Sequence, residues 1–258
     1  MTALLPQPNL WSQLTWRLRP VNRETLACPG FDDLPANLPT EMQTFVSDSY
    51  PRNHTYTPQQ DRLVPHRKLA VRVAGLSRYY PVPVTSLLDL SCSKGFFVFH
   101  AAARETCERA VGIDLSDECL ATCEHLNSRF DRRERVKFAR LTLPELAERI
   151  DEFGGPFQTV LLINTYQYLF FGSTVAPAVG PNHREIFRLL RTVCAGRLVF
   201  HNRLSLADLQ SDPQERAASA GTGALYHPQV IHEAAAEFFR VTTLRPWLGR
   251  PVWLLDAT

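Results

Sequence analysis

The chain has 258 residues, of which 45% are hydrophobic and 21% are charged, and its formal net charge is +2. This is ordinary globular composition, and the length suits one large domain or one domain with an appendage. No apolar run reaches the roughly 18 residues that a transmembrane helix needs, and the charge is too mild to require a nucleic-acid partner. The first residues lack the pattern of a secretory signal, so we expect a cytoplasmic protein with no membrane partner.

The cysteines predict free thiols rather than a metal site. They form no Cys-x-x-Cys pair and have no histidine at the spacing of a zinc site, so we expect no bound metal. Without a secretory signal, reduced thiols are the better interpretation. The six cysteines are Cys28, Cys92, Cys107, Cys119, Cys123 and Cys194.

Residues 1 to about 60 are rich in proline and polar side chains, which predicts an irregular arm with one or two helices. One expected helix is 40–47. A second is 61–80, because apolar residues recur there at approximately helical spacing and Pro81 then ends the pattern. We therefore treat residues 1–80 as an N-terminal arm and 81–258 as the main domain.

From Ser86 onward, short apolar runs alternate with longer helical stretches. The expected strands are 86–90, 110–113, 136–141, 159–164 and 197–202. The expected helices are 96–105, 117–130, 143–152, 182–194 and 229–238. This alternation predicts a doubly wound α/β fold with a mostly parallel sheet. The segments RVTTL and PVWLLDA follow each other too closely for a crossover connection, so they predict a closing antiparallel hairpin.

The turn after the first strand of this sheet, LLDLSCSKG, is the expected binding site. Ligands of open parallel sheets bind beyond the carboxyl ends of the strands, and small residues here let a ligand approach the backbone. The next strand ends in Asp114, which can accept hydrogen bonds from ribose hydroxyls. The spacing is not that of a dinucleotide fingerprint, because the bulky Phe96 occupies its third glycine position, and no P-loop is present.

LLDLSCSKGFF followed by VGIDLS resembles motif I and the next acidic strand of class I S-adenosylmethionine-dependent methyltransferases. Their usual loop has an acid and then three glycines at alternate positions, where this chain has Asp89, Ser91, Ser93 and Gly95. The resemblance covers roughly residues 85–258. It implies a Rossmann-like, doubly wound sheet of seven strands whose last strand is antiparallel, and an N-terminal segment that forms a helical lid.

The resemblance also implies roles for single residues. Asp89 orients the methionine amine, and the backbone of the loop holds the methionine part. Asp114 binds the ribose hydroxyls, Leu115 flanks the adenine, and Asn164 lies beside the sulfonium. The expected cofactor-binding residues are Asp89, Ser91, Cys92, Ser93, Gly95, Asp114, Leu115 and Asn164. One departure is the loop after the third strand, where Leu141 and Thr142 replace the aspartate that contacts adenine in many relatives.

Candidate catalytic residues follow the fourth and fifth strands. His201 is the first candidate for a general base, and the alternative is a histidine bonded to a loop carbonyl. Tyr166 is expected to face the methyl group, with an aromatic wall as the alternative. The expected substrate and lid residues are Tyr50, His54, Arg67 and Tyr168, and the insertion 170–181 is an expected substrate loop.

These observations favour an S-adenosyl-L-methionine-dependent methyltransferase that acts on a small organic molecule by O- or N-methylation, for example in specialised metabolism. One alternative is a tRNA or rRNA methyltransferase whose phosphate contacts are Arg52, Arg62, Arg67 and the basic run 129–140. Another is a non-catalytic binding partner that retains the fold. A dinucleotide oxidoreductase is disfavoured by Phe96.

Overall fold

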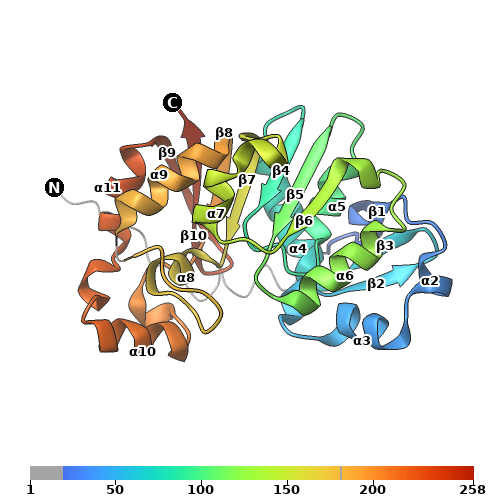
Figure 1. Ribbon diagram of the computed structural model, residues 1–258, viewed down its shortest axis with the longest axis horizontal. Coiled ribbons are helices and arrows are strands. Elements are labelled where there is room, and N and C mark those ends of the chain that lie inside the picture. The colour runs from blue at the N-terminus through green and yellow to red at the C-terminus, as the bar shows by residue number, and fades with distance from the viewer. Residues whose placement is uncertain (1–19, 181) are drawn as a thin grey trace.

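The computed structural model describes residues 20–180 and 182–258 (Figure 1). At its centre lies a seven-stranded sheet with the strand order β6-β5-β4-β7-β8-β10-β9. Only β10 is antiparallel to its neighbours, which confirms the predicted doubly wound sheet and its closing hairpin. The strands are β4 Ser86–Asp89, β5 Arg109–Ile113, β6 Val136–Ala139, β7 Phe157–Ile163, β8 Cys194–His201, β9 Phe239–Trp247 and β10 Arg250–Ala257.

The central strands are apolar on both sides because helices cover both faces of the sheet. Leu87 and Leu161 belong to the core on one face, whereas Leu88 and Val160 belong to the core on the other. Side chains of successive strand residues point to opposite faces of the sheet. A strand that is buried on both faces is therefore apolar at every position. The first face is covered by α4 Arg67–Leu76, α5 Phe96–Ala102 and α6 Asp117–Asn127, and the second by α7 Leu143–Glu148, α9 His183–Val193 and α11 Pro228–Ala236.

The remaining helices are short or lie beyond the sheet. In Figure 1, α8 Tyr166–Phe171 and α10 Ser211–Ala220 lie below the strands. Single 3₁₀ turns connect other elements: η1 Glu24–Leu26, η2 Arg52–His54, η3 Ser77–Tyr79, η4 Arg133–Arg135, η5 Ile150–Phe153, η6 Leu206–Asp208 and η7 Gly223–Leu225. None of the helices within the described ranges is long and apolar enough to cross a membrane.

The N-terminal segment differs in part from the prediction. The expected helix 40–47 is present as α3 Thr40–Asp48, preceded by α2 Leu34–Asn37. However, the segment also contains a small antiparallel sheet of order β1-β3-β2, formed by Cys28–Pro29, Arg62–Pro65 and Tyr56–Gln59. The part of the predicted lid before residue 20 lies outside the described residues.

The prediction of one helix over 61–80 was therefore wrong at its start. Arg62 pairs with Gln59 across a tight turn in which Gln60 has φ +47°, so the chain reverses and forms a hairpin. The helix α4 begins only at Arg67. Leu63 lies at helical spacing from the apolar residues of α4, which is why periodicity alone extended the helix backward.

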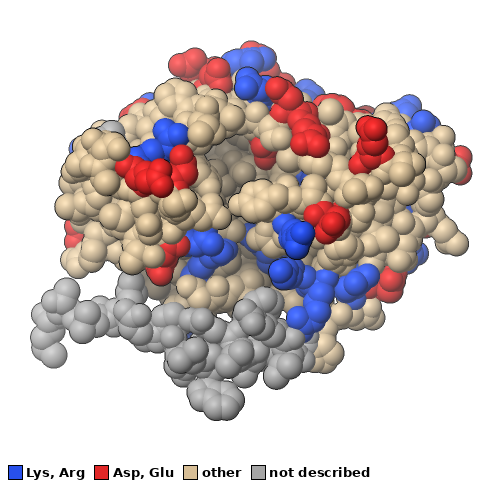
Figure 2. All heavy atoms as spheres, turned by 90° about the horizontal axis from the view of Figure 1, so that it is seen from below, with Lys and Arg blue, Asp and Glu red and all other residues tan. Residues whose placement is uncertain are grey.

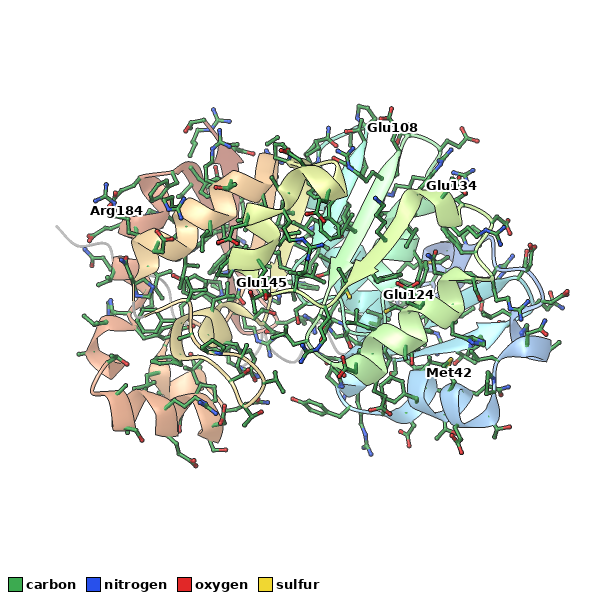
Figure 3. All side chains as sticks on the ribbon, viewed as in Figure 1. Met42, Glu108, Glu124, Glu134, Glu145 and Arg184 are labelled. Carbon is green, nitrogen blue, oxygen red and sulfur yellow. The ribbon has the colours of Figure 1, made fainter. Side chains whose placement is uncertain are left out.

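The order of the strands reverses between β4 and β7, because the chain runs outward through β5 and β6 before it returns to the other side of β4. The carboxyl ends of the parallel strands point to the bottom of Figure 1. Glu108 and Glu134, which precede β5 and β6, lie at the opposite edge (Figure 3). The lower edge beside β4 and β7 is therefore the expected ligand site.

Candidate functional site

The loop from Ser91 to Gly95 connects β4 to α5 through two residues in the left-handed region. Gly95 has φ +77°, and a Cβ atom there would lie 2.9 Å from Cζ of Phe138 and 3.0 Å from Sγ of Cys123. This position thus requires glycine both for its backbone and for its space. Ser93 has φ +50°, whereas Ser91 has no positive φ. Of the two serines in the motif, only Ser93 occupies a conformation that favours glycine.

Gly112 allows this loop to pack on the neighbouring strand β5. A Cβ atom at Gly112 would lie 2.8 Å from both Cβ and Sγ of Cys92. The backbone N–H of Cys92 donates to the carbonyl of Ile113 at 3.0 Å. Sequence analysis missed Gly112, although its place directly before the Ile-Asp end of the strand was a usable signal.

The carboxylate of Asp114 holds the loop in place. Its Oδ2 accepts the backbone N–H of Ser93 at 2.8 Å, and its Oδ1 accepts those of Leu115 and Ser116 at 2.8 and 3.0 Å. A carboxylate has about four lone-pair sites and three are used here, so Oδ2 retains acceptor capacity for one further donor. Asp114 lines both of the cavities described below.

Asp89 ends β4 as a buried acid with an unused acceptor. Its Oδ2 has no hydrogen-bond partner among the described residues. Burial raises its pKa to about 7, with a smaller contribution from Asp114 in the same direction, while the backbone N–H of Ser91 and the charge of Arg72 lower it. A buried, unpaired carboxylate oxygen is costly unless a cation or donor meets it. Asp89 is buried and lines neither of the cavities described below, so its free oxygen lies behind the loop and not on an open surface.

Two cavities meet beside Asp114. One is apolar and has a volume of about 440 Å³. It is lined by Ile113 at the end of β5 and Leu115 after it, by Leu141 and Leu143 after β6, and by residues 173 and 175–179. The other is polar and has a volume of about 620 Å³. Both are lined by Tyr50, Ser91, Asp114, Thr165 and Tyr168. The substrate-loop prediction for 170–181 coincides in part with the apolar cavity, and residue 181 lies outside the described residues.

The polar cavity is rich in cations. Figure 2 looks onto this edge of the molecule and shows a hollow with blue Lys and Arg side chains gathered beside it. Arg203 follows β8 and Arg250 begins β10, and both line the cavity. An Nη1–H of Arg250 donates to Oδ1 of Asn164, which follows β7. Sequence analysis did not identify Arg250, because its neighbour in space lies 86 residues away in the chain.

The N-terminal segment contacts the site directly. The hydroxyl of Tyr56 donates to the carbonyl of Lys94 in the loop at 2.6 Å. The hydroxyl of Tyr168 donates to Oε1 of Gln210 at 3.1 Å, and Nε2 of Gln210 donates to the hydroxyl of Tyr50 at 3.4 Å. This Tyr50–Gln210–Tyr168 bridge joins the N-terminal segment to α8 over the cavities.

His54 is the only histidine that lines either cavity in the described part of the chain. Burial, and to a smaller extent the charges of Arg72 and Lys94, hold its pKa well below the ordinary histidine value. His54 is therefore uncharged at pH 7.

The geometry does not support the two residues predicted to be catalytic. His201 has no exposed surface and lines neither cavity, and its Nε2–H donates to the carbonyl of Trp247 at 2.9 Å. Burial lowers its pKa to about 3, which leaves it neutral and inaccessible. Tyr166 is equally buried, and its hydroxyl donates to Nδ1 of His183 at 2.7 Å. A base must reach the acceptor atom, so the burial of His201 contradicts its assignment as the base, and Tyr166 does not line a cavity as its expected position beside the methyl group requires.

Other sequence candidates are distributed around the site. Thr165 and Tyr168 line the cavities, unlike Tyr166. The backbone at the start of α8 is held by Asn202, whose Oδ1 accepts the N–H groups of Thr165 and Tyr166 at 2.8 and 3.0 Å. Arg67 is exposed and lines neither cavity. No group of three or more His, Cys, Asp or Glu in residues 20–180 and 182–258 is placed to hold a metal ion.

No family model matches this sequence, and a search of curated proteins finds no significant relative. Solved structures do resemble the fold. PH0226 from Pyrococcus horikoshii OT3 aligns with a TM-score of 0.54 and 14% identity over 83% of this chain and 96% of its own. EvdMO1 aligns with a TM-score of 0.50 and 14% identity over 78% of this chain and 44% of its own.

An O-methyltransferase family protein from Burkholderia thailandensis aligns with a TM-score of 0.49 and 16% identity over 74% of this chain and 56% of its own. This chain thus spans about half the length of that protein and of EvdMO1. Similarity at such identities concerns the fold. The strand order and the similarity to PH0226 show the Rossmann-like fold of the class I S-adenosylmethionine-dependent methyltransferases.

Proposed function

We propose that this chain is an S-adenosylmethionine-dependent methyltransferase. The observation that carries the proposal is the unpartnered Oδ2 of Asp89, which lies behind a loop whose shape depends on Gly95 and Asp114. In this assignment the carboxylate of Asp89 accepts a hydrogen bond from the ammonium group of the methionine part. The backbone from Ser91 to Gly95 holds the rest of that part. Asp114 accepts the ribose hydroxyls. The bound cofactor supplies an electrophilic methyl group.

The apolar cavity is the proposed adenine site. Leu115 and Leu141 provide apolar surface for the two faces of a base. The hydroxyl of Thr142 donates to Oε2 of Glu145 at 2.7 Å in the capping box of α7, so it is already engaged as a donor. Glu145 is labelled on α7 in Figure 3. We infer that the adenine is held by packing rather than by a carboxylate.

The polar cavity is the proposed acceptor site. Asn164 lies at the carboxyl end of β7 and is fixed by Arg250, so its position next to the loop is well defined. Thr165 and Tyr168 orient the acceptor, and such alignment supplies much of the acceleration of a displacement. His54 accepts the proton that an oxygen or nitrogen acceptor releases.

A small organic molecule fits this site better than RNA. The Tyr50–Gln210–Tyr168 bridge joins residues that line the cavities, and cavity volumes of about 440 and 620 Å³ suit small ligands. Arg62 was one of the residues expected to contact RNA phosphates. In the structure it instead forms ion pairs with Glu24 and Asp61, each at 3.6 Å.

The test is incubation of the protein with S-adenosylmethionine and a panel of small acceptors, followed by mass spectrometry. One methyl group should be added to an acceptor, and the product should be absent with an Asp114→Ala variant that remains folded. Methylation of tRNA or rRNA, without methylation of any small acceptor, would contradict the proposed substrate class.

A further inference from the structure

The polar cavity carries more positive charge than its own carboxylate can balance. Arg52, Lys68, Arg203 and Arg250 line it, and Asp114 is the only acid that lines it among the described residues. Of these cations, Arg52 is exposed and lies 4.0 Å from Asp48. The side chains of Lys68 and Arg203 form no ion pair or hydrogen bond with any described residue.

The two arginines nearest the acceptor position repel each other. Arg250 is half-buried, and its partner, the Asn164 amide, is uncharged. Burial and then the charge of Arg203 lower the pKa of Arg250 to about 10, with only Asp208 acting in the opposite direction. Like charges that converge in a partly buried site destabilise it unless an anion lies between them.

A third arginine lies behind the cavity. Arg72 on α4 is buried, and none of its guanidinium nitrogens has a partner among the described residues. Burial has the largest effect on the pKa of Arg72, and the charges of Arg250 and Arg203 lower it further. Asp89 is the acid that opposes them at this position.

The proposed cofactor does not remove this imbalance. Its sulfonium and ammonium are positive and its single carboxylate is negative, so binding adds net positive charge beside Arg203 and Arg250. The remaining negative charge must come from the second ligand of the site. Guanidinium groups bind carboxylate and phosphate oxygens through paired N–H donors, and such charged hydrogen bonds are short and strong.

We propose that the methyl acceptor is an anionic small molecule whose phosphate or carboxylate group is bound between Arg203 and Arg250. This inference rests on the proposed methyltransferase function. Because Arg250 also holds Asn164, the anionic group is anchored close to the end of β7, where the methyl group is transferred. The anchor orients the acceptor and neutralises the cations next to the sulfonium.

The experiment uses the protein saturated with S-adenosylhomocysteine. Inorganic phosphate, pyrophosphate and benzoate are titrated into it by calorimetry, for the wild type and for Arg203→Gln and Arg250→Gln. The matched control is Arg245→Gln, which removes the same charge from an exposed position on β9 that lines neither cavity. Affinity for S-adenosylhomocysteine is measured in parallel for every variant.

At least one anion should bind saturably to the wild type and to the Arg245→Gln control. It should bind about tenfold more weakly or worse to Arg203→Gln and Arg250→Gln, because a hydrogen bond to a charged group contributes roughly 1.5–3 kcal/mol. Affinity for S-adenosylhomocysteine should change by less than about twofold in Arg203→Gln and Arg245→Gln, and Arg203→Gln carries this comparison because Arg250 also holds Asn164. If Arg250→Gln fails to fold, Arg203→Gln alone gives the same test.

Several results would overturn the inference. Anions that bind equally well to Arg203→Gln, or do not bind to the loaded wild type, would remove the anionic anchor. A loss of S-adenosylhomocysteine affinity with unchanged anion binding would assign the arginines to the cofactor's own carboxylate. Tight, salt-sensitive binding of tRNA that is lost in Arg203→Gln would replace the small acceptor by RNA. A wild type that binds no S-adenosylhomocysteine would refute the proposed function itself.

Discussion

Replacing Asp89 by asparagine tests whether this buried carboxylate binds the ammonium of the cofactor. Only the ionised carboxylate forms that ion pair. Without ligand, burial raises the pKa of Asp89 to about 7, so the group is largely protonated at pH 6. The groups that act on it are the Ser91 N–H, Asp114 and Arg72, and of these only Asp114 adds to the effect of burial. Cofactor binding should therefore release a proton below pH 7.

The expected size follows from this pKa. If only the ionised form binds, the apparent dissociation constant is multiplied by one plus the ratio of protonated to ionised carboxyl. That factor falls from about 11 at pH 6 to about 2 at pH 7, so affinity rises about fivefold. Asp89→Asn should bind the cofactor weakly and without this dependence on pH.

The stability of the ligand-free protein should fall over the same pH range in which the affinity for the cofactor rises. A carboxyl group whose pKa is raised in the folded state stabilises the fold below its unfolded pKa of about 3.9, and this contribution is lost as the pH rises through about 7. The ligand-free Asp89→Asn variant should thus be more stable than the wild type at pH 8, by as much as about 4 kcal/mol, and similar at pH 3.5.

The assay is calorimetry with S-adenosylhomocysteine at pH 6 and pH 7, in two buffers of different ionisation enthalpy. Proton release at pH 6 should be close to one per site in the wild type and absent in Asp89→Asn. Wild-type affinity that does not change between these pH values, or a pH dependence that persists in Asp89→Asn, would refute the assignment.

Three further predictions concern the loop and the acceptor site. Gly95→Ala should abolish cofactor binding because its Cβ would collide with Phe138. The control is Gly221→Ala, which is also at positive φ but has no atom within 4 Å of the added Cβ. Chemical denaturation should show that this control loses only about 1 kcal/mol of stability. Asp114→Asn should weaken cofactor binding roughly 10- to 100-fold in calorimetry and should also lower the melting temperature, because an amide nitrogen cannot accept the backbone N–H groups that the carboxylate holds; unchanged affinity would remove Asp114 from the site. His54→Gln should lower kcat about 100-fold or more while cofactor affinity is retained, and undiminished turnover would exclude His54 as the base.

Much of the central fold was predictable because its signals are local. The apolar run before Asp89 reflects a strand buried on both faces, and a helix follows it at Phe96 as expected. The small residues of the loop indicated a close approach of backbone and ligand. Gly95 then proved essential for the backbone, whereas Ser91 lies at a position that does not require glycine.

The errors concern positions where tertiary packing decides which residues contact the site. His201 ends a strand at the expected edge, but its imidazole is directed to the carbonyl of Trp247, and no pattern in β8 reveals that contact. Arg250 enters the site because β10 runs antiparallel and brings its first residue to the carboxyl edge beside Asn164. The strand at Arg62 depends on a turn through Gln60, which carries no strong turn signal.

The most direct measurement of the central claim is calorimetric titration of the purified protein with S-adenosylmethionine and S-adenosylhomocysteine, with NAD as the control. Saturable binding of the first two with one site per chain, and no binding of NAD, is the predicted result. Absence of binding by both sulfur compounds would contradict the methyltransferase account and favour a binding partner that retains only the fold.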